Sequence, residues 1–429
     1  MCGIVGVLGN HEAAPLLVEA LKRLEYRGYD SAGIATVNDG HLDRRRAVGK
    51  LVNLSDLLVH DPLAGKSGIG HTRWATHGAP SVTNAHPHRA GPVAVVHNGI
   101  IENFRELRCE LAEKGLNFVT ETDTETVALL VQSFMADGHT PIEAARLTLS
   151  RLHGAFALAF LFDGEEDLLI AARKGSPLAI GHGDGEMFVG SDAIALAPLT
   201  DRITYLEEGD WAVITRNSLE IRDENNALAN RETRKIEVDN ARVDKGGHKH
   251  FMAKEIAEQP SVIGEAIRHY LTNDAAHVQL PDDTLDFTQI DRLTMVACGT
   301  AFYACLTAKY WFEQLAKIPV EVDIASEFRY RTPVIVANTL YICISQSGET
   351  ADTLSALRDI QKQTPAGLVS LALCNVPTSS LVRETDIFLP TLAGPEIGVA
   401  STKAFTTQLV ALILLILKVG VTQKRMTDE

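Results

Sequence analysis

MCGIVGVLGN, residues 1–10, places a cysteine directly after the initiator methionine and directly before an apolar run that glycines interrupt. Such a run is typical of a buried strand. Removal of Met1, which the small side chain of Cys2 permits, leaves a thiol and a free α-amine on one residue. The amine, with a pKa of about 8, can act as a general base at neutral pH. Cys2 is therefore a candidate N-terminal nucleophile, although a cysteine at this position can also be an accident of the start of the chain, and the rest of the domain decides between the two.

Residues 1 to about 240 continue with short strand-like runs that are separated by few helical patterns. The runs are GIVGVLG, GIATV, GIGHTRWAT, VAVVHNG, AFALAFLF, DLLIAAR, MFVGSD and DWAVIT. Leu17, Leu21 and Leu24 recur at the spacing of one helix face. Many strands with few helices predict a layered α+β domain.

A polar stretch between residues 216 and 255 is the best candidate linker, and the pattern of strand-like and helical segments changes after it. After it, an apolar run, a loop of small residues and a helical pattern follow one another repeatedly, beginning at LTMVACGT, TLYICISQSGET and GLVSLALCN. This repeat predicts βα units on a parallel sheet. We therefore expect a first domain at residues 1–240, a linker and helical lead-in at 241–285, and an α/β domain at 286–429.

Composition excludes several classes of protein. The net charge of -15 argues against nucleic acid as a partner, because a nucleic-acid binder requires a basic face. Six cysteines without paired spacing indicate a reduced, cytoplasmic protein, and the N-terminus lacks the pattern of a secretory signal. The apolar run at residues 409–417 is shorter than the roughly 20 residues that cross a membrane, so we expect a buried helix there.

Two segments of the first domain, GIGHTRWATHGAP at residues 68–80 and VVHNGIIEN at residues 95–103, place polar groups beside apolar strands. Arg73 offers a planar fork that suits a carboxylate. Asn98 and Gly99 can supply a side-chain amide and a backbone N–H to a tetrahedral oxyanion. This combination is typical of a site for acyl transfer.

Asp123 and the histidines of this domain allow both functional and structural interpretations. Asp123 can hold a substrate ammonium, but Thr122 and Glu125 also fit a capping box, which makes the segment a helix start. The histidines lack the spacing of a zinc site. We therefore predict no metal and no redox cofactor. The histidines are His71, His77, His86, His88 and His97.

Six motifs in order resemble the glutaminase domain of N-terminal-nucleophile amidotransferases: CGIVGVLG, LEYRGYDSAGIA, HTRWATHG, NAHPH, HNGIIEN and TDTE. The RGYDSAG and HTRWATHG forms are most similar to the glucosamine-6-phosphate synthase family. The resemblance implies an αββα sandwich in which Cys2 attacks the glutamine amide and Asn98 and Gly99 form the oxyanion hole. In this family a residue similar to Trp74 gates the passage of ammonia. The glutamine site implied by the resemblance contains Arg73, Trp74, Thr76, His77 and Asp123.

SQSGETADT, residues 345–353, follows a strand-like run and opens a helix. Hydroxyl and backbone N–H groups then meet the positive end of the helix dipole, which predicts a cradle for a phosphate. ACGTA at residues 297–301 and VASTKAFTT at residues 399–407 repeat the pattern before other helices. Ordinary turns with N-caps are the alternative, because Ser and Thr are favoured at that position in any case.

This second half resembles a sugar-isomerase (SIS) domain with a flavodoxin-like parallel sheet, and MAKEIAEQP and SEFRYR are similar to segments of the same family. The resemblance implies glutamine and fructose 6-phosphate as substrates and a homodimer formed through the SIS domains. The family carries a second SIS domain and a C-terminal tail, so we expect this chain to be a fragment or short form without a complete isomerising site. The expected sugar-phosphate contacts are Thr300, Ser345, Gln346, Ser347, Thr350, Val399 and Ser401.

The leading hypothesis is an enzyme that hydrolyses glutamine and passes ammonia to fructose 6-phosphate, giving glucosamine 6-phosphate and glutamate. An amidotransferase that makes phosphoribosylamine is a weaker hypothesis, because nothing resembles the acidic phosphoribosyl-diphosphate loop of that family. A regulatory sugar-phosphate sensor with a vestigial glutaminase is an alternative of another class. Intact Cys2, Arg73 and Asn98 argue against a vestigial site.

Overall fold

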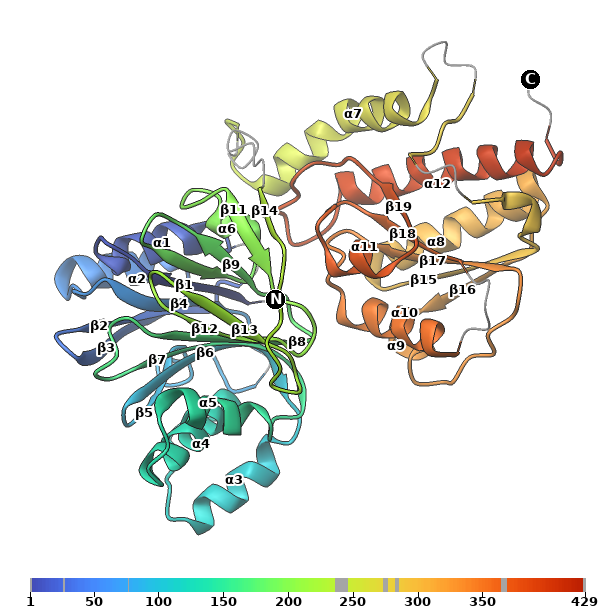
Figure 1. Cartoon of the computed structure of the whole chain (residues 1–429). Helices are drawn as coiled ribbons and strands as arrows, with labels where there is room; N and C mark the ends of the chain where they lie inside the picture. The colour runs from blue at the N-terminus through green and yellow to red at the C-terminus, as the bar shows by residue number, and fades with distance from the viewer. Residues whose placement is uncertain are drawn as a thin grey trace. The chain divides into compact units, whose positions relative to one another are not determined.

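The computed structural model describes residues 2–25, 28–75, 77–235, 246–272, 277–281, 285–363 and 369–426. The chain divides into two compact units, Met1–Asn240 and Ala241–Glu429 (Figure 1). Thr76, one of the predicted glutamine-site residues, and residues 236–245 of the predicted linker lie outside the described residues.

The first unit contains two antiparallel sheets, one of eight strands and one of six. The eight-stranded sheet has the order β14-β11-β9-β10-β1-β4-β2-β3, and the six-stranded sheet has the order β13-β12-β8-β7-β6-β5. The strands are β1 (Gly3–Leu8), β2 (Ser31–Asn38), β3 (His41–Val48), β4 (Ser67–Arg73), β5 (His88–Ala90), β6 (Val93–Ile101), β7 (Gly154–Phe162), β8 (Leu169–Lys174), β9 (Ala179–His182), β10 (Met187–Gly190), β11 (Arg202–Tyr205), β12 (Trp211–Ile214), β13 (Leu219–Arg222) and β14 (Thr233–Lys235).

Helices cover the outer face of each sheet, so this unit has four layers (Figure 1). Helices α1 and α2 pack on the eight-stranded sheet, whereas α4 and α5 pack on the six-stranded sheet. This arrangement is the αββα sandwich expected from the sequence. The helices of the unit are α1 (Ala13–Lys22), α2 (Leu51–His60), α3 (Phe104–Glu113), α4 (Thr124–Ala136), α5 (Pro141–Leu149) and α6 (Ala193–Leu196).

Strand β1 shows how the sequence forms these layers. Ile4 and Leu8 point into the hydrophobic core between the two sheets, whereas Val5 and Val7 point into the core under α1. Successive side chains of a strand alternate between its faces, and both faces here are buried. A continuous apolar run is therefore what this central strand requires.

All eight strand-like runs of the first domain form strands. The predicted linker at residues 216–255 is wrong in part, because β13 and β14 lie within it and helix α7 begins at Phe251. β13 alternates apolar and charged residues and β14 is polar and exposed throughout. Both are edge strands, so their composition resembles that of a polar loop.

The second unit contains one parallel sheet of five strands in the order β16-β15-β17-β18-β19. In chain order this is 2-1-3-4-5, the flavodoxin-like order. The strands are β15 (Arg292–Ala297), β16 (Val320–Ile324), β17 (Thr339–Ser345), β18 (Val369–Cys374) and β19 (Ile387–Pro390). The helices are α7 (Phe251–Tyr270), α8 (Gly299–Trp311), α9 (Ala325–Phe328), α10 (Ala351–Gln363), α11 (Ser380–Glu384) and α12 (Lys403–Thr422), with the π-helical turn η4 at Phe312–Ala316.

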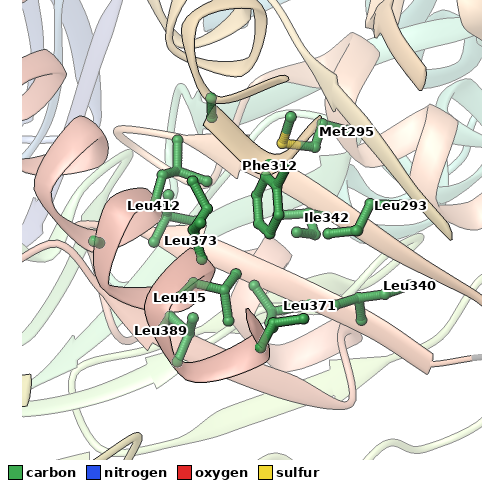
Figure 2. Packing of buried hydrophobic residues seen from close by; sticks show 14 of the residues in the cluster. Leu293, Met295, Phe312, Leu340, Ile342, Leu371, Leu373, Leu389, Leu412 and Leu415 are labelled. Atoms are coloured by element: carbon green, nitrogen blue, oxygen red, sulfur yellow. The ribbon is translucent and has the colours of Figure 1, made fainter. Parts of the chain in front are cut away.

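Helices cover both faces of the parallel sheet. Figure 2 shows the core on one face, where Leu412 and Leu415 of α12 lie with Phe312 against residues of the strands. On the other face, Phe328 of α9 and Ile360 of α10 pack in a separate cluster. Among the described residues, α12 is the helix that is long and apolar enough to cross a membrane. Of its most apolar window, 56% is buried inside this unit, as in the core helix of an α/β domain.

Candidate active site

The backbone places Cys2 at the end of a central strand. β1 pairs with β4, with Gly3 opposite Thr72, so the register brings Cys2 to Arg73, the last residue of β4, and close to Trp74, which follows it. The Trp74 N–H donates a hydrogen bond to the Cys2 sulfur at 3.2 Å. Burial raises the pKa of the Cys2 thiol, and the Trp74 N–H offsets part of that rise. The sulfur is therefore a thiol at neutral pH and requires a base to become a nucleophile.

A cavity of about 290 Å³ opens beside Cys2 and collects most of the predicted glutamine-site residues. A concave, partly apolar cavity with a few convergent polar groups is the usual form of a small-molecule site. Of the predicted glutamine-site and oxyanion residues that the structure describes, all line this cavity. The full lining is Cys2, Arg73, Trp74, His77, His86, His97, Asn98, Gly99, Ile100, Thr122, Asp123, Thr124, Ser176 and Pro177.

Asn98 and Gly99 lie on β6 with their donors near the nucleophile. The Asn98 Nδ2 donates to the backbone oxygen of Cys2 at 3.1 Å. Gly99 has φ +123°, and a Cβ atom there would lie 2.0 Å from the oxygen of Ala155. Only glycine fits this position. Asn98 and Gly99 line the same cavity as Cys2, and a side-chain amide and a backbone N–H are the kinds of donor that stabilise a tetrahedral oxyanion.

His71 holds the Asn98 side chain in this orientation. Its Nε2 lies 3.0 Å from Asn98 Oδ1 and 2.9 Å from the backbone oxygen of His97. Both partners accept hydrogen bonds, so Nε2 carries the proton. Burial lowers the pKa of His71 to about 3. The imidazole is therefore neutral at physiological pH, and it fixes the amide nitrogen of Asn98 toward Cys2.

Arg73 is buried and is one of the residues that line the cavity. Nη2 donates to the backbone oxygens of His77 and Gly78, at 3.0 Å in the case of Gly78. Nη1 lies 3.9 Å from Asp30, and it has no hydrogen-bond acceptor among the described residues. A buried guanidinium nitrogen without an acceptor suits an anionic ligand.

Asp123 also lines the cavity. Its Oδ2 accepts a hydrogen bond from the Ile101 N–H at 2.9 Å. The capping-box interpretation is confirmed in one half only: Thr122 Oγ1 accepts the Glu125 N–H at 3.4 Å. The Glu125 carboxylate accepts the N–H groups of Val119 and Thr120 and not that of Thr122. The carboxylate of Asp123 is therefore positioned by the end of β6.

The hydroxyl groups of Thr122 and Thr124 contact the buried histidines. The sequence did not predict these contacts. Thr124 Oγ1 lies 2.9 Å from both His86 Nε2 and His97 Nδ1. Thr122 Oγ1 lies 3.0 Å from His88 Nε2. The described residues contain no group of three or more His, Cys, Asp or Glu arranged to hold a metal ion.

Ser176 and Pro177, which also line the cavity, were missed by the sequence interpretation. They follow β8 in the segment KGSP and carry no recognisable catalytic signal. Only the fold brings this loop to the nucleophile. Trp74 is 42% exposed at the cavity and packs edge-on against Tyr29, with the ring centroids 5.3 Å apart.

In the second unit, the loops after β15 and β17 meet at one edge of the sheet. These two strands are neighbours, and the chain order reverses between them. Ligands of open α/β sheets bind outside the carboxyl ends of the strands at such a switch point. Thr300 lies in the first turn after β15, and the SQSGET loop follows β17. The expected sugar-phosphate residues of these two loops are therefore brought together.

The SQSGET loop is organised by its own hydroxyl groups. Ser345 Oγ accepts the Gly348 N–H and lies 3.0 Å from Thr350 Oγ1. Ser347 Oγ accepts the Glu349 N–H at 3.2 Å. Gln346 is half-buried in the same turn. The loop ends where α10 begins, at Ala351.

The turn before α12 differs from this arrangement. The carboxylate of Glu396 accepts the backbone N–H groups of Thr402 and Ala404 at 2.8 and 3.2 Å, and the Ser401 hydroxyl at 2.9 Å. An acidic side chain therefore takes these donors, unlike in the SQSGET loop, and the anion cradle at the start of this helix stays a prediction. Val399 is exposed in the same turn.

Comparisons with known proteins agree with both units. Residues 73–198 match a glutamine amidotransferase domain family and residues 286–418 match the SIS domain family. A glutamine–fructose-6-phosphate aminotransferase [isomerizing] of Brucella suis is 60% identical over 412 residues, which cover 96% of this chain and 67% of that protein. A protein of the same description from Bradyrhizobium diazoefficiens is 57% identical over 430 residues, which cover 100% of this chain and 70% of that protein.

A solved structure is also similar in part. The C-terminal domain of glucosamine-fructose-6-phosphate aminotransferase from Francisella tularensis is 50% identical over 43% of this chain and 51% of that one, with a TM-score of 0.41.

Proposed function

Because the chain belongs to the glutamine–fructose-6-phosphate aminotransferase family, we propose that it converts glutamine and fructose 6-phosphate to glutamate and glucosamine 6-phosphate. The observation that carries the proposal is the cavity in which Cys2, Arg73 and Asn98 converge. The experiment that tests it is an assay of glutamate and glucosamine 6-phosphate formed from the two substrates. Absence of glutamate contradicts the glutaminase half of the proposal, and glutamate without glucosamine 6-phosphate contradicts the transfer of ammonia to the sugar by this chain.

In the glutaminase half-reaction, we propose that the α-amine of Cys2, free after Met1 is removed, takes the thiol proton. The sulfur then attacks the amide carbon of glutamine, and the oxygen becomes an oxyanion held by Asn98 Nδ2 and the Gly99 N–H. The protonated amine returns its proton to the leaving nitrogen, so ammonia departs and a thioester remains. Water, deprotonated by the same amine, releases glutamate and restores the thiol.

The glutamine backbone binds through charge. We propose that Arg73 takes the α-carboxylate and that Asp123 takes the α-ammonium, because the two side chains line one cavity with opposite charges. His77 and Trp74 complete the walls of the cavity, and Thr76 is assigned to the same site from the family resemblance. Trp74 is further proposed to gate the passage of ammonia.

Replacing Arg73 with lysine is expected to raise KM for glutamine roughly tenfold or more while kcat changes less. A compact ammonium keeps the charge but cannot form two parallel hydrogen bonds with a carboxylate. Steady-state rates of glutamate release at varied glutamine concentration measure the effect. Arg202→Lys, at an exposed position of β11, is the matched control. An unchanged KM in Arg73→Lys refutes the carboxylate assignment.

For the sugar half, we propose that the phosphate of fructose 6-phosphate binds at the start of α10. The contacts come from the hydroxyl-rich loop and from backbone N–H groups of the first helical turn, which have no partner within a helix. The ammonia released at Cys2 condenses with the ketone carbon of the sugar with loss of water. The proposed contacts are Thr300, Ser345, Gln346, Ser347, Thr350, Val399 and Ser401.

Ser347→Ala and Thr350→Ala are each expected to weaken binding of fructose 6-phosphate roughly ten- to a hundredfold. Each removes a hydrogen bond to a charged phosphate, worth about 1.5–3 kcal/mol. Calorimetric titration with fructose 6-phosphate and with unphosphorylated fructose gives the comparison, and Ser355→Ala on the same helix is the control. Equal binding of the two sugars, or no loss in the variants, means that the loop is only a capped turn.

We also propose that the protein works in the cytoplasm as a homodimer formed through the SIS domains. The proposal is supported by large aromatic side chains on one side of α8, where Tyr303 and Tyr310 are 61% and 62% exposed. Apolar surface of this kind is typical of interfaces. We assign the glutaminase domain to residues 1–240, a linker and helical lead-in to 241–285, and the SIS domain to 286–429.

A further inference from the structure

The motif MAKEIAEQP lies on the first half of α7, and neither half-reaction uses it. Three of its polar side chains bind the chain between residues 397 and 406, on either side of the proposed contacts Val399 and Ser401. We propose that Glu255, assisted by Glu258 and Gln259, is a positioning residue that holds this segment in the shape that receives the sugar. The inference rests on the proposed function of the SIS domain.

Glu255 fixes the start of the segment. Its side chain is buried, with the residue 2% exposed. Oε1 accepts the N–H of Ile397 at 2.6 Å and of Gly398 at 2.9 Å, and Oε2 lies 3.1 Å from the Gly398 nitrogen. A carboxylate that accepts several backbone N–H groups forms strong bonds, because the acceptor is charged. Their number and short distances define the path of the backbone at these two residues.

Gly398 permits this close approach. A Cβ atom at that position would lie 2.5 Å from Glu255 Oε2. Since real Cβ atoms do not approach an oxygen so closely, only glycine allows the carboxylate to sit against the backbone. The hydrogen bonds of Glu255 to this backbone therefore depend on glycine at position 398, although the two residues are far apart in sequence.

Glu258 and Gln259 fix the other end of the segment. Lys403 Nζ lies 2.7 Å from Glu258 Oε2, and the Lys403 side chain is only 5% exposed. Thr406 Oγ1 donates to Gln259 Oε1 at 2.6 Å. A cation in the first turn of a helix is unfavourable with respect to the helix dipole. The placement of Lys403 is therefore explained by its acidic partner on α7.

The three α7 residues share one helix face, because positions i, i+3 and i+4 are neighbours. One rigid face thus holds both ends of the segment, and Val399 and Ser401 lie between the two attachments. In the first half of α7, Glu255 is the only residue that is fully buried. Hydrogen bonds and one ion pair join this half of the helix to the segment.

The test compares Glu255→Gln with Glu265→Gln, an exposed glutamate on the same helix, in the full chain. The amide of glutamine keeps one acceptor and turns a donor toward the Gly398 N–H, so the segment shifts. We expect binding of fructose 6-phosphate to weaken roughly tenfold or more. Binding of inorganic phosphate, which requires only the SQSGET loop, and KM for glutamine stay unchanged. Calorimetric titrations with both ligands supply these values.

The outcomes separate this inference from the proposed function. If the wild-type chain does not bind fructose 6-phosphate, the proposed sugar site itself is refuted. If the wild type binds it and Glu255→Gln binds equally well, only the positioning role is overturned. If Glu255→Gln loses affinity for inorganic phosphate as well as for fructose 6-phosphate, Glu255 has a general structural role, and the positioning role is also overturned. Should Glu255→Gln fail to fold, Glu258→Gln, at a less buried position, is measured in the same way, and unchanged sugar-phosphate binding there overturns the inference.

Discussion

Cys2→Ala is expected to lower the rate of glutamine hydrolysis by a factor on the order of 10³ to 10⁶, the scale seen when a covalent nucleophile is removed. The sulfur forms the bond to the amide carbon, and no other group lining the cavity is a thiol. Glutamate release at saturating glutamine measures the rate. The fold should be unaffected, since the change removes one sulfur atom at the end of a strand.

Cys109→Ala is the matched control, because Cys109 is an exposed free thiol on α3. It should leave the rate unchanged. A Cys2→Ala rate within a few-fold of the wild type removes the nucleophile assignment. A protein that retains Met1 should be nearly as inactive as Cys2→Ala, because its α-amine is then no longer on the residue that carries the thiol.

Asn98→Ala is expected to lower kcat roughly 10²- to 10³-fold with little change in KM for glutamine. Its amide N–H stabilises the oxyanion, which exists only after the sulfur has attacked, so binding of glutamine itself does not depend on it. Steady-state kinetics of glutamate release separate the two constants. Asn217→Ala, in an exposed turn after β12, is the control.

A rise in KM at constant kcat assigns Asn98 to glutamine binding and contradicts the oxyanion role. Asn98→Asp extends the comparison, because aspartate has nearly the same shape but is acceptor-only when ionised. We expect it to be as inactive as the alanine variant. His71 would then face a carboxylate in place of the amide oxygen, and the donor toward Cys2 would still be missing.

The sequence predicted the fold best where strands are buried on both faces. β1 and β7 are continuous apolar or small-residue runs, β4 begins as one before its polar end at His71–Arg73, and each was recognised. β3, with the sequence HLDRRRAV, was not recognised. It lies at the edge of the eight-stranded sheet, where several side chains face solvent, so its charged residues resemble a loop.

The motifs predicted the residues of the candidate site, but they did not predict the contacts that hold those residues in place. The roles proposed for Arg73 and Asn98 follow from the chemistry of their side chains. The roles of His71, which orients Asn98, and of Glu396, which caps α12, depend on register and on loop paths. Nothing in the sequence indicates that Glu255 binds a loop 142 residues away. Such contacts are set by tertiary packing and not by local pattern.

The most direct test of the central claim is the mass of the N-terminal peptide after reaction with a chloroketone analogue of glutamine. A nucleophilic sulfur displaces chloride from such an analogue and forms a stable thioether. The account predicts a peptide that begins at Cys2, without Met1, and that carries one analogue on that residue, with glutamine protecting against the reaction. A peptide that retains Met1, or an adduct located on any other residue, contradicts it.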